Sequence, residues 1–227
     1  MDLHVAVIGA GRMGSFVGVQ LPAGVRKTIV DSNEEAAKAL AVEIGCSYGT
    51  TMNDARDADV IILTLPASVI EDVVKEVAGM VKEGSLILDM ATGNQISDEV
   101  KADNPNLTFL DAKIVGSALV MKLGFPGWVV VDSEDAEMLD RIRFLLPGYS
   151  RVVSGKAKLV QELNTIGAEE GIRAAVSVRK KLRSYQISRE MEDLVIRTVC
   201  VGTMLGYVDD DLGHFGKSLA ERLESDD

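Results

Sequence analysis

The feature that most constrains this sequence is a glycine-rich turn that joins an apolar strand to a helix near the N-terminus. The run Val5-Ala6-Val7-Ile8 leads directly into the turn, which has glycines at positions 9, 11 and 14. Gly9 permits a tight turn, Gly11 lets the backbone approach a bound group, and Gly14 lets the new helix pack closely on the sheet. Free N–H groups at the helix N-terminus can bind a phosphate group. The segment therefore predicts a strand, turn and helix that hold a phosphate-containing ligand.

A second predicted strand ends on an acid, Asp31, which follows Ile29-Val30. In dinucleotide-binding domains, an acid roughly 20 residues after the glycine turn accepts hydrogen bonds from a ribose of NAD and repels the 2′-phosphate of NADP. The alternative is an N-cap or turn aspartate ahead of Ser32 and Asn33. Because position and motif agree, we expect the chain to bind NAD, with NADP less favoured.

Strand and helix signals alternate through the first two-thirds of the chain. This alternation predicts an α/β fold: a doubly wound Rossmann-type, mostly parallel sheet with helices on both faces. Two helices are expected to begin at capping boxes, Ser32 with Glu35 and Ser68 with Glu71. Strands are expected near residues 4–8, 26–31, 59–65, 85–90, 107–111 and 127–131.

From about Lys156 onward, apolar residues recur at helical spacing, and further helices are expected over residues 189–207 and 212–223. The chain is thus expected to divide into a dinucleotide-binding domain, residues 1–154, and an all-helical C-terminal extension, residues 155–227. An extension this small has little core of its own. It is expected to pack on the first domain, on a second subunit or on both, and a homodimer through these helices is the favoured arrangement.

The bulk properties exclude several classes of partner. A formal net charge of −11 disfavours nucleic acid and anionic membranes as general partners, because long-range repulsion opposes both. No apolar run approaches the roughly 18 residues of a membrane span, and no secretory signal is recognised at the N-terminus. Cys46 and Cys200 lack metal-ligand spacing and are interpreted as reduced thiols, no metal site is expected, and a cytoplasmic location is predicted.

In a doubly wound sheet, ligands lie over the carboxyl ends of the strands. Two loops, Leu65-Pro66 and Ala91-Thr92, follow predicted strands and are expected to flank the ribose and nicotinamide. Arg12 lies inside the glycine turn, where it either contacts phosphate or is solvated. The predicted cofactor-binding residues are Gly9, Ala10, Gly11, Arg12, Met13, Gly14, Asp31, Ser32, Leu65, Pro66, Ala91 and Thr92.

Four segments together resemble the 6-phosphogluconate dehydrogenase-like superfamily, which includes β-hydroxyacid dehydrogenases, prephenate dehydrogenases and deazaflavin-dependent NADP reductases. The segments are residues 7–14, 59–66, 87–92 and 109–112, and the resemblance covers about residues 4 to 165. The resemblance implies that Gly9, Gly11, Gly14 and Asp31 bind NAD(P).

The catalytic half of the chain departs from those families. Where the β-hydroxyacid dehydrogenases have a substrate-loop serine, a catalytic lysine and an asparagine, this sequence has Val115, Gln161 and Thr165. Gln161 cannot exchange a proton as lysine can. The histidine of prephenate dehydrogenases is also absent near Ala112-Lys113. The substrates of these families are therefore not assigned to this chain.

Catalytic residues are unassigned by the sequence, and each of the four candidates has an ordinary alternative. Lys113 follows a predicted strand end and could polarise a carbonyl or hold a carboxylate, although a surface lysine in a loop is slightly favoured. Gln161 and Asn164 offer polar groups on the long helix, and Asn164 is one residue from the family's asparagine position. His214 could donate a proton if the last helix covers a cleft, but a lone exposed histidine is commoner.

The favoured function is an NAD(P)-dependent oxidoreductase that transfers hydride to or from a small carbonyl, hydroxyl or imine substrate. The first alternative is a non-catalytic NAD-binding or sensing protein, motivated by Val115, Gln161 and Thr165. The second alternative is a reductase that moves hydride between NADP and a deazaflavin, which needs little acid–base help. Asp31 argues against the NADP preference of that class.

Overall fold

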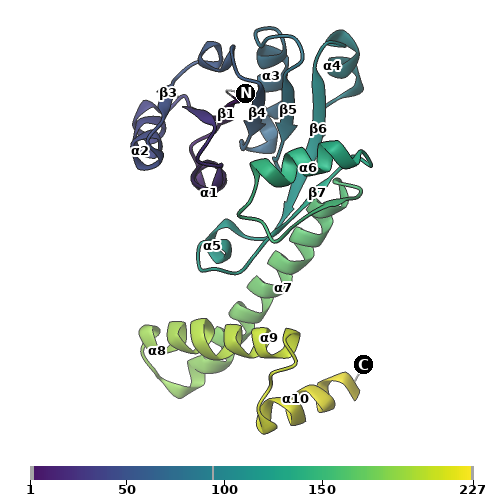
Figure 1. Ribbon diagram of the computed structural model, residues 1–227. Helices are drawn as coiled ribbons and strands as arrows, with labels where there is room; N and C mark the ends of the chain where they lie inside the picture. Colours follow the sequence, from purple (N-terminus) through teal and green to yellow (C-terminus); the bar gives the residue numbers. More distant parts are fainter. Residues whose placement is uncertain (1–2, 94, 226–227) are drawn as a thin grey trace. The chain divides into compact units, whose positions relative to one another are not determined.

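An eight-stranded sheet forms the centre of the first compact unit of the chain (Figure 1). The computed structural model describes residues 3–93 and 95–225, and it divides into two units, Met1–Asn164 and Thr165–Asp227. The strands are β1 (His4–Ile8), β2 (Arg26–Val30), β3 (Ser47–Gly49), β4 (Val60–Leu63), β5 (Leu86–Asp89), β6 (Thr108–Val115), β7 (Trp128–Val131) and β8 (Arg151–Ser154).

The strand order in the sheet is β3-β2-β1-β4-β5-β6-β7-β8. Strands β1 to β6 pair in parallel, β7 pairs antiparallel with β6, and β8 pairs in parallel with β7. The first six strands follow the Rossmann order. Successive strands are added on one side of β1 up to β3 and on the other side from β4 onward, and this change leaves a crevice over the carboxyl ends of β1 and β4. The predicted fold class, a doubly wound and mostly parallel sheet with a helical C-terminal region, is confirmed.

Helices cover both faces of this sheet because its central strands are apolar on both sides. Val60–Leu63 and Leu86–Asp89 are fully buried strands, as expected where each face of a parallel sheet is covered. The helices of the sheet unit are α1 (Arg12–Gln20), α2 (Glu34–Ile44), α3 (Ala67–Ala78), α4 (Asp98–Asp103), α5 (Ala118–Met121) and α6 (Ala136–Leu145), with a 3-10 turn at Met52–Ala55.

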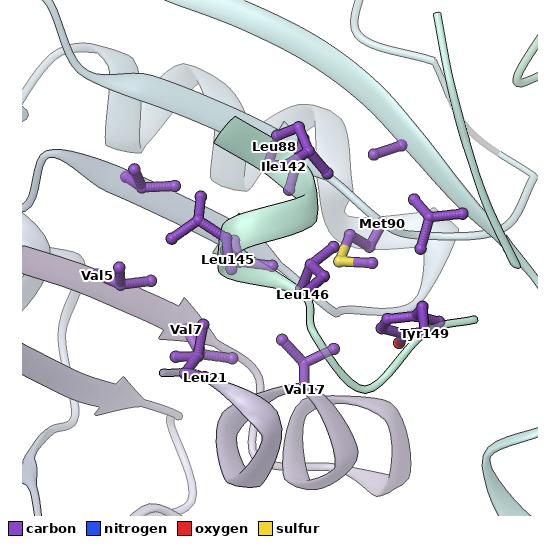
Figure 2. Close-up of a cluster of buried hydrophobic side chains, with 14 of the residues drawn as sticks. Val5, Val7, Val17, Leu21, Leu88, Met90, Ile142, Leu145, Leu146 and Tyr149 are labelled. Atoms are coloured by element: carbon purple, nitrogen blue, oxygen red, sulfur yellow. The ribbon is translucent and has the colours of Figure 1, made fainter. Parts of the chain in front are cut away.

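Alternate residues of β1, β2, β4 and β5 enter two separate apolar clusters. In one cluster, Val5, Val7 and Leu88 of the sheet pack with side chains of α1 and α6 (Figure 2). In the other, Ile61 and Ile87 pack with apolar residues of α3 and α4. The two clusters fix both helix layers on the sheet, so the carboxyl edge of the strands is held rigidly enough to carry a site.

Several local predictions are corrected by the structure. Strands β3 and β8 were not expected; β3 has three residues and β8 has only one buried residue, so neither gives a strong apolar signal. The cap of α2 is Asn33, whose Oδ1 accepts a hydrogen bond from Ala36 N at 3.1 Å, and not Ser32. Helix α3 begins at Ala67 with Pro66 as its N-cap residue, so Ser68 lies inside its first turn and is not the cap.

The second unit contains helices only within its described part. They are most of α7 (Leu159–Leu182), a 3-10 turn (Arg183–Tyr185), α8 (Arg189–Leu194), a π-helical segment (Val195–Cys200), α9 (Val201–Val208) and α10 (His214–Ser225). The predicted boundary at residues 154/155 precedes α7, whereas the compact units divide within it, at residues 164/165. Val160 is buried and Asn164 Nδ2 donates a hydrogen bond to Ile114 O at 2.8 Å, which attaches the start of α7 to the sheet.

In the described residues, no helix combines the length and the apolar character needed to cross a membrane. Cys46 and Cys200 are both half-buried free thiols.

Candidate cofactor and substrate site

The glycine turn after β1 has room for glycine alone at two of its positions. Gly9 has a φ of +106°, and a Cβ built there would lie 2.9 Å from the carbonyl oxygen of Thr64. A Cβ on Gly14 would lie 1.8 Å from the carbonyl oxygen of Gly9. The hydroxyl of Thr64 donates to the carbonyl oxygens of Ile8 and Gly9, both at 3.0 Å. The end of β4 therefore fixes the turn against the first turn of α1.

The space outside the turn is open where a phosphate group would lie. A Cβ built on Gly11 would meet nothing within 4 Å, so packing within the chain does not require a glycine at this position. Gly11 is the N-cap residue of α1 and makes no side-chain cap, and the first turn of α1 has no acidic residue. Arg12, its first residue, is exposed. An uncapped helix N-terminus, with free backbone N–H groups and the positive end of the helix dipole beside a glycine, is suited to bind a pyrophosphate.

Asp31 follows β2 and lies beside this turn. Its Oδ2 accepts a hydrogen bond from Ala10 N at 2.7 Å, and its Oδ1 accepts one from Asn33 N at 2.8 Å. Asp31 thus has the structural role of a turn aspartate, because its carboxylate links the glycine turn to the N-terminus of α2. Each carboxylate oxygen has a second lone-pair site, so the group keeps capacity to accept hydrogen bonds from ribose hydroxyls.

The remaining predicted cofactor residues lie on loops at the carboxyl edge of the sheet. Leu65 is half-buried and the N-cap Pro66 is exposed after β4, whereas Ala91 is buried and Thr92 is exposed after β5. Ser32 is exposed. The half-buried Met13 is the second residue of α1, and its sulfur lies 3.7 Å from the hydroxyl of Tyr149.

The structure corrects the expectation that Lys113 is a surface lysine in a loop. It lies within β6, is 2% exposed, and is one of three buried charged residues at the carboxyl edge of the parallel sheet. Its Nζ is 2.5 Å from Asp89 Oδ2 and 3.1 Å from Asp111 Oδ1. Burial raises the pKa of Asp89, and the Lys113 ammonium acts in the opposite direction. We call these three residues the buried charge cluster.

A small cavity lies next to the buried charge cluster. Its volume is about 240 Å³ and its lining residues are Gly93, Gln95, Lys113, Ala157, Lys158 and Gln161. Two of the four catalytic candidates therefore lie together, one on β6 and one on α7. A Cβ built on Gly93 would lie 3.1 Å from the Gln161 amide nitrogen, so this glycine permits the close approach of the helix.

The other two candidates lie elsewhere. Asn164 is half-buried and its amide is engaged with Ile114 O, which gives it a structural role. His214 is exposed and begins α10 in the second unit. Among residues 3–93 and 95–225, no group of three His, Cys, Asp or Glu side chains could hold a metal ion.

Sequence reasoning missed Asp89, Asp111, Gln95 and Lys158. A usable signal existed for the two acids, because each ends an apolar run at the predicted ligand-binding edge of the sheet. No comparable signal marks Gln95 or Lys158, which are exposed residues on irregular loops.

Comparison with known proteins supports the cofactor half of the site. Residues 22–118 match the family model of the prephenate dehydrogenase nucleotide-binding domain. No curated protein matches the sequence. The matched region includes Asp31 and the buried charge cluster and begins after the glycine turn.

Many solved structures share the fold. A semialdehyde dehydrogenase NAD-binding protein from Cupriavidus necator, solved with calcium and NAD, matches 100% of this chain and 91% of its own, with 17% identity and a TM-score of 0.71. Pyrroline carboxylate reductase from Plasmodium falciparum, solved with NADP, matches 97% and 84%, with 12% identity and a TM-score of 0.67. A 3-hydroxyisobutyrate dehydrogenase from Mycobacterium tuberculosis, solved with L-serine, matches 86% and 70%, with 23% identity and a TM-score of 0.63.

Two of these structures were solved with NAD or NADP, and the family model describes a nucleotide-binding domain. The resemblance seen in the sequence is confirmed at the level of the fold: the chain has an NAD(P)-binding dehydrogenase fold, and residues 22–118 match a prephenate dehydrogenase nucleotide-binding domain.

Proposed function

We propose that this chain is an oxidoreductase that uses NAD in preference to NADP and transfers hydride to or from a small carbonyl, hydroxyl or imine compound. The observation that carries the proposal is the pairing, in one sheet, of a dinucleotide-binding edge with a polar cavity. Asp31 and the glycine turn lie at the carboxyl ends of β2 and β1, and the cavity lies beside those of β5 and β6.

The residues present fit a dinucleotide. The open space at Gly11 and the uncapped start of α1 would hold the pyrophosphate, and Asp31 would bind a ribose through its free lone-pair sites. Bound at this edge, the nicotinamide supplies or accepts the hydride. The protein residues orient it and keep the neighbouring cavity polar.

A non-catalytic NAD-binding sensor is the second candidate function. It is favoured by Val115, Gln161 and Thr165, which stand where the resembling families have a serine, a lysine and an asparagine. The two functions differ in turnover: a sensor would bind NADH but would not oxidise it with any carbonyl compound.

Substituting Asp31→Asn is expected to narrow the preference for NADH over NADPH by tenfold or more, about 1.4 kcal/mol. The amide oxygen can still accept a hydrogen bond from Ala10 N, so the glycine turn keeps its support. The negative charge that repels a 2′-phosphate is removed. Fluorescence titration with each nucleotide measures the ratio, and Asp57→Asn, at an exposed aspartate, is the matched control. An unchanged ratio in the Asp31→Asn protein would refute the NAD assignment.

We also propose that the second unit forms a homodimer. None of its described residues, 165–225, is buried, although its helices carry large apolar side chains. An apolar groove of about 490 Å³ lies between α9 and α10 and is lined mainly by Met204, Tyr207, Val208, Leu212, Leu219 and Leu223. Such a helical unit lacks the core needed to hold its fold and gains one by pairing with a second copy.

The substitution Val208→Asp is expected to convert a dimer into a monomer, because Val208 is 80% exposed in one chain and lines this groove. Burying an unpaired carboxylate in an apolar interface costs several kcal/mol. Light scattering coupled to size exclusion measures the mass. Val42→Asp, at a valine of α2 that is 75% exposed, is the control and should leave the mass unchanged. A monomeric native protein would refute the proposal.

A further inference from the structure

The buried charge cluster is built by the register of two strands. Asp89 and Asp111 are paired partners on the parallel strands β5 and β6, and Lys113 follows Asp111 by two residues, so all three occupy the same face of the sheet. Their exposures are 0%, 3% and 2%. Three charged groups are thus buried together at the ligand-binding edge, where desolvation is costly.

The hydrogen bonding of this cluster is incomplete. The ammonium of Lys113 has three donors, and it makes two hydrogen bonds, to Asp89 Oδ2 at 2.5 Å and to Asp89 O at 3.3 Å. Asp111 Oδ1 is buried and accepts no hydrogen bond from the described residues, although it lies 3.1 Å from Nζ. The Lys113 ammonium therefore keeps one N–H that makes no hydrogen bond with the described residues, and a ligand oxygen in the cavity can accept it.

The described residues that line the cavity beside Lys113 offer mainly hydrogen-bond donors. Among its described lining residues are two lysines and two amides, and none of these residues is a carboxylate, whereas the chain carries a net charge of −11. Lys113 is at the buried end and Lys158 is exposed on the loop that leads into α7. Asp89 and Asp111 offset the charge of Lys113, so Lys158 is the cationic group that an anionic ligand would meet at this cavity.

We propose that this cavity binds a small anionic carbonyl compound of the 2-oxo acid type, with Lys158 holding its carboxylate and Lys113 acting as the catalytic acid. The inference rests on the proposed oxidoreductase function and names the substrate class and the proton donor for it. Gln95 and Gln161 contribute amide donors and acceptors to the walls of the same cavity.

The chemistry balances with a reduced nicotinamide as the hydride donor. As the carbonyl carbon gains the hydride, the π electron pair of the C=O bond moves to oxygen, and this oxygen takes a proton from the Lys113 ammonium. The product is a 2-hydroxy acid, and Lys113 is left as a neutral amine between Asp89 and Asp111. The amine regains its proton from solvent through the cavity mouth.

The substrate class is tested by calorimetric titration of the full chain with oxamate, an unreactive isostere of a small 2-oxo acid. Oxamate is expected to bind, and Lys158→Ala is expected to weaken it at least fivefold. Lys156→Ala is the matched control, since Lys156 is an exposed lysine two residues away that does not line the cavity. Equal affinities of the two variants, or no binding to the native chain, would overturn the substrate class.

The role of Lys113 is tested with Lys113→Arg, which keeps the positive charge but cannot release a proton. NADH and oxamate affinities are expected to remain within about threefold of the native values, while NADH oxidation with a panel of 2-oxo acids falls at least 100-fold. Should the arginine not fit, Lys113→Met with Asp89→Asn and Asp111→Asn, which removes all three charges, supplies a second variant with the same expected loss of turnover.

The outcomes separate the two proposals. Failure of the native chain to bind NADH refutes the oxidoreductase function. The oxamate titration then still tests whether the cavity binds a small 2-oxo acid. Turnover of neutral aldehydes with no preference for 2-oxo acids keeps the oxidoreductase function and refutes the substrate class. Binding of both NADH and oxamate without any turnover refutes the oxidoreductase function in favour of a sensor. Full activity of the Lys113 variants refutes Lys113 as the acid.

Discussion

Replacing Gly14 by alanine is expected to lower the affinity for NADH by about 100-fold or more (about 2.7 kcal/mol) and to destabilise the fold by about 3 kcal/mol. The added Cβ would lie 1.8 Å from the carbonyl oxygen of Gly9 and 2.7 Å from Thr64 Oγ1. Neither neighbour is the far end of a mobile side chain, because Thr64 is hydrogen-bonded to the turn itself. Helix α1 must therefore move away from the strand, and the phosphate-binding end moves with it.

Two further glycines separate packing from ligand binding. Gly11→Ala is expected to leave the free energy of unfolding almost unchanged, because its Cβ meets nothing within 4 Å, yet to weaken NADH by obstructing the pyrophosphate. Gly167→Ala, in α7 and also in open space, is the control for NADH binding, which it should leave unchanged. Urea unfolding and NADH fluorescence titration measure both quantities. If Gly11→Ala binds NADH as tightly as the native chain, the pyrophosphate does not lie at this turn.

The cofactor edge could be predicted from the sequence because its geometry is local. A strand, a glycine turn and a helix occupy a single continuous segment, and the turn reaches Asp31 after only one further strand. The six stronger strands were also predictable from their apolar runs. The edge strands β3 and β8 were missed because a three-residue strand and a half-exposed strand carry little apolar signal.

The buried charge cluster could not be predicted in the same way. The contact between Lys113 and Asp89 spans 24 positions and depends on the pairing register of β5 with β6. The sequence interpretation also places Lys113 in a loop after the strand end. In the structure the parallel pairing of β6 with β5 ends at Asp111, and β6 continues through its antiparallel pairing with β7. A lysine that a local interpretation leaves at the surface is thus buried by two long-range pairings.

The cavity also depends on a long-range contact. Gln161 reaches Gly93 because Asn164 attaches the start of α7 to Ile114 on β6. In the sequence, Gln161 stands where the resembling family has a lysine, and Asn164 is one residue from that family's asparagine position. Gln161 lines the cavity, whereas Asn164 fixes the helix that carries Gln161.

Substituting Lys113→Met is expected to lower the free energy of unfolding by about 3–5 kcal/mol at neutral pH. The substitution leaves the buried carboxylates of Asp89 and Asp111 without a counter-ion, at 0% and 3% exposure. Lys82→Met is the matched control. Its ammonium lies 2.6 Å from Asp59 Oδ1, but the two side chains are 46% and 33% exposed, so its loss should cost less than about 1 kcal/mol.

The pH dependence of this deficit distinguishes lost charge from lost packing. Burial raises the pKa of Asp89 in the folded state, so the folded chain holds that proton more readily than the unfolded chain, and stability is lost as the pH rises through the raised pKa. Removing the Lys113 ammonium removes the interaction that opposes this rise. The difference in unfolding free energy between native and Lys113→Met proteins should therefore shrink as the pH falls from about 8 to about 5, as protonation relieves the unpaired charge. Urea titrations at both pH values measure it; a deficit that does not change with pH would mean that Lys113 stabilises the sheet by packing alone.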